Sequence, residues 1–243
     1  MKKLLFAGVA VAVLCCAPAL AADIPVKAPV YKAAAAPIFD WTGPYAGIAA
    51  GWGWGHSNQT DPGIPPDGEP ADGSYRLRGG LIGGTLGYNW QSGPWVFGLE
   101  ADYSWADIKG HSDTCGTAPP HPCGTKLQSF GTARARIGNA MGAALPYITG
   151  GLAFGDVHGW DSFTPASGSK VYVGWTVGAG IEWQLPSNWS AKLEYLYADL
   201  GKHQLFDVVP GVPETVSVNV NIVRLGLNYK FGSVGKSPVV ARY

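Results

Sequence analysis

The feature that most constrains this chain is a strict two-residue alternation in four long segments. Successive side chains of a β-strand point to opposite faces of a sheet, so a period of two separates two environments. One face of each segment carries bulky apolar and aromatic residues, and the other carries glycine, polar and charged residues. The sequence therefore predicts strands at 95–106, 171–184, 189–198 and 223–231.

The tryptophans and the length of these segments favour a barrel that crosses a membrane. A small barrel has room inside for small residues and a few charges, but not for rows of tryptophan. About 9–11 tilted residues cross a bilayer, whereas a typical soluble strand has about 5–6. Aromatic residues near strand ends suit the two membrane interfaces. We expect these side chains to face lipid: Trp95, Phe97, Leu99, Tyr103, Trp105, Trp175, Ile181, Trp183, Leu193 and Tyr195.

Four weaker segments complete the predicted sheet, at 45–54, 76–90, 127–139 and 147–154. The first two are rich in glycine and do not show which face points outward. The connections alternate, with long loops at 56–74, 107–126, 155–170 and 199–216 and short turns at 91–94, 141–145 and 186–188. This layout predicts an all-β fold, an eight-stranded antiparallel up-and-down transmembrane β-barrel over residues 41–231, with its short turns in the periplasm.

Segments before and after the predicted barrel have other compositions. Residues 1–22 show a charged start, an apolar stretch and small residues before Asp23, as in a secretory signal peptide. A lipoprotein is the disfavoured alternative, because Leu14 and Cys15 stand where its cleavage site needs a small residue. Residues 23–40 are rich in proline and alanine and predict a periplasmic linker, and residues 232–243 form a C-terminal extension.

Two cysteines remain after the predicted signal peptide, Cys115 and Cys123, in a segment rich in proline and glycine. Export implies an oxidising compartment, so the sequence predicts a disulfide between them. A metal site that adds His111 and His121 is the alternative, but the spacing matches no standard zinc pattern. No cofactor is expected.

The inward face of the predicted barrel carries charges that we expect to pair, because an unpaired buried charge is costly. The turn at 186–188 places Glu182 opposite Lys192. Two interpretations stay open: a plug of salt bridges, or a selective ring in a narrow pore for small solutes or ions. The plug is favoured, because side chains can fill an eight-stranded barrel. The predicted network comprises Glu100, Asp102, Arg134, Arg136, Glu182, Lys192, Glu194, Arg224 and Lys230.

Composition and histidine placement argue against other function classes. Seventeen basic residues balance seventeen acidic ones, which gives no electrostatic basis for binding nucleic acid. The five histidines fall in or beside predicted loops, and none pairs with an acid at a recognisable catalytic spacing. We therefore do not expect an enzyme, and a soluble ligand-binding barrel is also disfavoured.

Five short motifs follow one another in a fixed order along the predicted barrel. The first is Trp-Thr-Gly-Pro-Tyr-Ala-Gly at 41–47, and the others lie at 87–91, 98–105, 194–197 and 223–231. Together they resemble the small proteobacterial outer-membrane immunogenic, or porin-like, β-barrel family, which is similar to the membrane domain of outer membrane protein A. The resemblance implies the outer membrane of a Gram-negative bacterium, surrounding lipid as partner, and a role as a surface antigen that supports envelope integrity.

The last of these motifs also resembles the signal that barrel-assembly machinery reads. Its pattern is a polar residue, a glycine, and alternating apolar and aromatic residues that end in phenylalanine. The family commonly ends at that phenylalanine, whereas this chain continues to Tyr243, so the sequence leaves open which end is read. The matching residues are Arg224, Gly226, Leu227, Tyr229 and Phe231.

Overall fold

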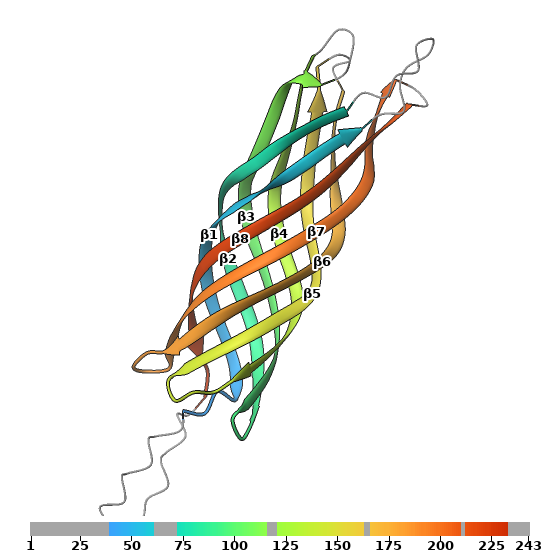
Figure 1. Cartoon of the computed structure of the whole chain (residues 1–243). Helices are drawn as coiled ribbons and strands as arrows, with labels where there is room; N and C mark the ends of the chain where they lie inside the picture. The colour runs from blue at the N-terminus through green and yellow to red at the C-terminus, as the bar shows by residue number, and fades with distance from the viewer. Residues whose placement is uncertain (1–38, 61–71, 116–120, 163–165, 210–211, 233–243) are drawn as a thin grey trace, which may run out of the picture. The chain divides into compact units, whose positions relative to one another are not determined.

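Eight antiparallel strands form a closed barrel in which β8 pairs with β1 (Figure 1). The computed structural model describes residues 39–60, 72–115, 121–162, 166–209 and 212–232. The predicted eight-stranded up-and-down barrel is confirmed. The strands are β1 (Gly43–Thr60), β2 (Asp72–Ser92), β3 (Trp95–Cys115), β4 (His121–Asn139), β5 (Ala144–Asp161), β6 (Ala166–Gln184), β7 (Trp189–Val209) and β8 (Val212–Lys230).

Several predictions about the ends of the chain concern residues that the structure does not describe. The signal peptide at 1–22, all but the last two residues of the linker at 23–40, and residues 233–243 of the extension lie outside the described residues. Within the described part of the chain, no helix is both long and apolar enough to span a membrane.

The strands are longer than predicted. The predicted bounds of the four long loops were therefore wrong, because each loop is shorter than expected. β1 continues to Thr60, β3 to Cys115 and β7 to Val209. The error has a physical cause: beyond Trp54 and Trp105 the alternation continues with its polarity reversed. Glycine, proline and aspartate in these stretches suggested loops, although most of the residues pair with a neighbouring strand.

The barrel wall has two halves of opposite polarity. We call the end with the turns near 93, 142 and 187 the turn end, and the opposite end the loop end. In the half near the turn end, bulky apolar side chains point outward and charged ones inward. In the half near the loop end, polar side chains point outward and an apolar core fills the interior. This core includes Leu77, Leu81, Ile108, Leu127, Phe130, Val157, Tyr172, Leu196, Leu200, Val216, Val218, Val220 and Ile222.

The outer apolar band has the height of a membrane. Nine of the ten residues predicted to face lipid are exposed on the outer face, and Ile181 is partly exposed. Trp95 and Trp105 mark the two edges of the band on β3. Ten residues span about 33 Å along a strand, or about 25 Å after a tilt of about 40°. β1 and β2, whose facing the sequence left open, turn Trp52 and Leu86 outward.

Cys115 and Cys123 form a disulfide at the loop end, with their Cα atoms 5.9 Å apart. It joins the last residue of β3 to the third residue of β4. The two sulfurs lie over Gly73 of β2, where an added Cβ would be 2.6 Å from Cys115 Sγ. The cross-link therefore packs against the strand wall and has a glycine beneath it because no side chain would fit.

Removing this disulfide is expected to lower the free energy of unfolding by about 2–3 kcal/mol, the entropy of closing a short loop in the unfolded chain. The change is Cys115→Ser with Cys123→Ser, measured by urea unfolding in lipid vesicles. Reductant should shift the wild-type midpoint to that of the double variant and leave the variant unchanged. Equal midpoints for oxidised and reduced wild type would contradict the prediction.

Candidate functional site

A network of eight buried charged side chains crosses the barrel interior at the level of the outer apolar band. It has four carboxylates and four cations, so its formal charge is balanced. Each of these residues is at most 5% exposed. The members are Glu100, Asp102, Arg134, Arg136, Glu182, Lys192, Glu194 and Arg224.

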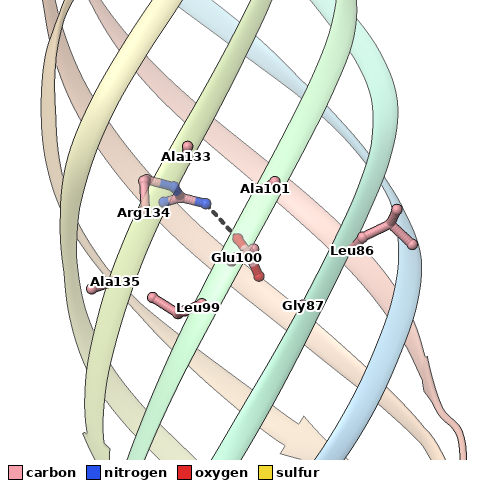
Figure 2. A pocket seen from close by; sticks show the side chains of 8 residues that line it. All are labelled: Leu86, Gly87, Leu99, Glu100, Ala101, Ala133, Arg134 and Ala135. Carbon is pink, nitrogen blue, oxygen red and sulfur yellow. Dashed lines mark hydrogen bonds and ion pairs between the residues drawn. The ribbon is translucent and has the colours of Figure 1, made fainter.

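Arg134 on β4 joins three carboxylates. Its Nη2 donates to Glu100 on the neighbouring strand, and Figure 2 shows the two side chains directed toward one another. The same nitrogen lies 3.2 Å from Asp102 Oδ2, and Nη1 donates to Glu194 Oε1 at 3.1 Å. Glu100 and Arg134 face each other in the β3–β4 register, whereas Glu194 comes from β7. One guanidinium therefore ties adjacent strands to the far side of the lumen.

Arg224 on β8 makes the second set of links. Its two terminal nitrogens donate to the two carboxylate oxygens of Asp102 at 2.9 and 3.0 Å, and its Nε donates to Glu194 Oε2 at 2.6 Å. A planar guanidinium matches a carboxylate in this paired geometry, which strengthens both hydrogen bonds. Lys192 Nζ donates to Glu100 Oε2 at 2.7 Å.

Arg136 forms a second centre closer to the turn end. Its Nη1 donates to Glu182 Oε2 at 2.9 Å and its Nε to Asn89 Oδ1 at 3.0 Å. The guanidinium carbon lies 4.9 Å from the ring centre of Tyr45 and 5.2 Å from that of Tyr147. The two aromatic rings therefore contact the guanidinium of Arg136 and keep water away from its faces.

Cross-strand glycines make room for the two tyrosines. Tyr45 faces Gly87 in the β1–β2 register, and a Cβ at Gly87 would lie 2.3 Å from the Tyr45 ring. The ring can therefore lie flat against the wall and donate its hydroxyl to Glu100 at 2.8 Å. Tyr147 faces Gly180 in the same way, and its hydroxyl also donates to a carboxylate of the network.

Neutral side chains satisfy further lone pairs of the carboxylates. Ser190 Oγ and Asn228 Nδ2 donate to Glu182 Oε1 at 2.5 and 2.9 Å. Thr132 Oγ1 donates to Asp102 Oδ2 at 2.5 Å. Such added hydrogen bonds are needed if ion pairs are to offset the cost of removing charges from water.

One member of the predicted network was wrong. Lys230 lies outside it: its Nζ donates to the backbone oxygen of Asp40 and sits 4.9 Å from the ring centre of Phe39. Glu182 and Lys192 face each other in register, as predicted, and the lysine amine donates to Glu100 across the lumen. Sequence spacing predicts which residues face one another across a hairpin, but not how a long side chain crosses a barrel.

The charged network lies between apolar side chains on both sides along the barrel axis. The loop-end core covers it on one side. Trp41, Val96 and Leu145 form a smaller buried cluster toward the turn end, packed against Phe39. A void lined by Phe39, Tyr45 and other residues has a volume of about 10 Å³, the space of about one water molecule.

The outer face over this network carries a shallow depression of about 590 Å³ (Figure 2). Its lining is mostly apolar and includes Leu86 and Leu99 with the small side chains Ala101, Ala133 and Ala135. It opens on the lipid-facing band rather than into the lumen. Its chemistry therefore suits acyl chains and does not add polar groups to the site.

A histidine–acid pair at the loop end was not predicted from the sequence. His121 Nε2 lies 3.0 Å from Asp161 Oδ2, joining the start of β4 to the end of β5. The residues are forty positions apart, so only the barrel register brings them together. Among the residues the structure describes, no cluster of three or more potential metal ligands occurs. His111, the other ligand considered for a metal site, is exposed.

The residues of the predicted assembly signal lie on β8 and just beyond it. Arg224 points inward and belongs to the charged network, whereas Leu227 and Phe231 are exposed on the outer face. Gly226 and Tyr229 are partly exposed. Recognition by assembly machinery stays a prediction.

Comparison with known proteins agrees with this architecture. The family model described as outer membrane protein beta-barrel domain matches residues 7–231. The 31 kDa outer-membrane immunogenic protein of Brucella melitensis is 38% identical over 95% of this chain and 100% of the relative. The 25 kDa outer-membrane immunogenic protein of Brucella abortus is 33% identical over 85% of both chains.

Solved structures of outer-membrane proteins are also similar. The Escherichia coli outer membrane protease OmpT has a TM-score of 0.47 at 12% identity, covering 79% of this chain and 98% of that one. OprG from Pseudomonas aeruginosa has a TM-score of 0.45 at 15% identity, covering 79% and 97%. On the family model and the Brucella relatives, this chain is a protein of the Gram-negative outer membrane and belongs to the family of outer membrane protein beta-barrel domains.

Proposed function

We propose that the protein is a closed structural barrel, exposed at the cell surface, that supports the envelope without catalysing a reaction. The observation that supports this most is the stacking of a balanced charged network against an apolar core inside one barrel. Water and ions would need to displace both layers to pass. The partners in this proposal are the lipid of the outer membrane and the barrel-assembly machinery.

A narrow channel for small solutes or ions is the second candidate. The observation that favours it is that charges of both signs line the interior from β3, β4, β6, β7 and β8. Rings of charged side chains select ions in known pores. Such a channel would require the network and the loop-end core to rearrange together.

The folded wild-type protein is expected to give no discrete conductance steps in planar bilayers at high salt. Heat-dependent gel mobility of the same preparation verifies that the barrel is folded, and an open porin serves as the positive control. Reproducible steps would contradict the closed barrel. If Arg134→Ala altered those steps while the exposed Arg78→Ala did not, the lumen would be the conducting path and the channel would replace the plug.

A further inference from the structure

A row of arginine, lysine and histidine side chains runs around one side of the outer barrel surface near the loop end. We call it the basic row. Its members are exposed or partly exposed on the outer face of β1 to β5. The row comprises His56, Arg76, Arg78, Lys109, Lys126 and His158.

The strand register makes this row continuous. Arg78 faces Lys109, Lys109 faces Lys126, and Lys126 faces His158. On β1 and β2, His56 faces Arg76. Like charges placed directly opposite on neighbouring strands destabilise a sheet, so this arrangement favours an anionic partner that lies across several strands.

Carboxylates of the protein neutralise only part of the row. Asp107 lies 3.0 Å from both Lys109 and Lys126. Within the described residues, no ion pair involves Arg76 or Arg78. The two arginines are two residues apart on β2 and both are exposed, so they present adjacent guanidinium groups to the surroundings.

The basic row lies directly beyond the apolar band. On β1, His56 is the next outward residue after Trp54, and on β3, Lys109 follows Trp105 by four residues. Two to four residues correspond to about 7–13 Å along a strand. After a tilt of about 40° this distance becomes about 5–10 Å. The row therefore begins within the headgroup layer, which adds about 5–7 Å to each side of the hydrocarbon core, and Lys109 lies near the outer edge of that layer.

On β7 and β8, the outward residues next to the edge of the apolar band are not basic. Asn219 on β8 faces His56 on one side and Asp199 on the other, and Asn221 lies beside Trp54. Four arginine and lysine side chains therefore lie close together over β2 to β4, whereas β6 and β7 carry only Lys170 and Lys202 within the described residues near the loop end. A surface that only needed solubility would not require this asymmetry.

From these observations we propose that the basic row binds the phosphate groups of an anionic lipid in the leaflet at the loop end, with Arg76 and Arg78 as its principal ligands. A guanidinium can donate two parallel hydrogen bonds to a phosphate, and basic clusters beside a membrane attract anionic headgroups. The acyl chains of the same lipid would then lie against the adjoining apolar band. This proposal rests on the outer-membrane location and is independent of whether the lumen is closed.

The test measures lipid binding to the refolded full chain in non-ionic detergent by native mass spectrometry. The probe is lipid A with two phosphates, compared with lipid A from which both phosphates are removed. We expect R76Q/R78Q to weaken binding of the phosphorylated probe by about tenfold or more, and the wild type to bind the dephosphorylated probe about as weakly. Added salt should reduce the difference.

The matched control is K170Q/K202Q, which removes two exposed cations from β6 and β7. It should bind the phosphorylated probe as the wild type does, and both variants should keep heat-dependent gel mobility. Unchanged binding by R76Q/R78Q, or equal loss in both variants, would overturn the proposal. Complete competition by millimolar inorganic phosphate would also overturn it, because the partner would then be a soluble phosphate compound rather than a lipid.

Discussion

Replacing Arg224 by alanine is expected to lower the free energy of unfolding by about 3–5 kcal/mol, because one partner is removed from a buried ion pair. Its side chain is fully enclosed and bonds both Asp102 and Glu194. Without it, two carboxylates remain away from water with fewer donors. Urea unfolding from lipid vesicles, followed by tryptophan fluorescence, measures the loss.

The control for this prediction is Lys202→Ala, which removes an exposed cation from β7 and should change stability by less than about 0.5 kcal/mol. A double-mutant cycle with Asp102→Asn tests the cause. Because Arg224 bonds both oxygens of Asp102, the loss in the double variant should be smaller than the sum of the two single losses. Additive losses, or a loss below about 1 kcal/mol for Arg224→Ala, would show that the network does not hold the barrel together.

The inward charges of the network could be predicted from sequence because they alternate with residues that suit lipid. Glu100 and Glu194 each lie in a segment whose other face is bulky and apolar, and Arg134 alternates with the small apolar residues Ala133 and Ala135. Once that face is assigned to lipid, the period of two assigns the charges to the lumen. Lys230 follows the same alternation but lies at the end of β8, where backbone oxygens compete with carboxylates for its amine.

The loop-end core could not be predicted in the same way. Ile108, Leu200 and Val216 alternate with polar residues, as expected for a strand with its apolar face inward. The residues of the same strands nearer the turn end have the opposite polarity, so a single pattern does not describe the whole strand. The reversal follows from the surroundings: outside the bilayer, the outer face meets water and the apolar side chains turn inward.

This reversal explains why one barrel needs two kinds of interior. In the membrane half the outer face is already apolar, and a charged interior ties distant strands with directional bonds. In the loop-end half the outer face is hydrated, and burial of apolar side chains supplies the stabilisation. Each part of the barrel thus follows its own polarity pattern, one suited to lipid and one suited to water, along the same eight strands.

The second large effect is expected from Phe130→Ala, which should cost about 3–5 kcal/mol because it leaves a cavity in the loop-end core. Phe130 is fully buried on β4 and belongs to that core. Phe97→Ala is the matched control, since the same side chain on β3 is 47% exposed on the outer face. There lipid can fill the vacated space, so the loss should be about 1 kcal/mol.

The same pair of variants separates the two layers of the interior. Phe130→Ala should remain without conductance in planar bilayers, because the charged network toward the turn end still fills the lumen. Equal stability losses for Phe130→Ala and Phe97→Ala would mean that the loop-end core does not stabilise the barrel. Conductance steps in Phe130→Ala alone would instead assign closure of the barrel to the apolar layer, leaving the ion pairs to hold the strands together.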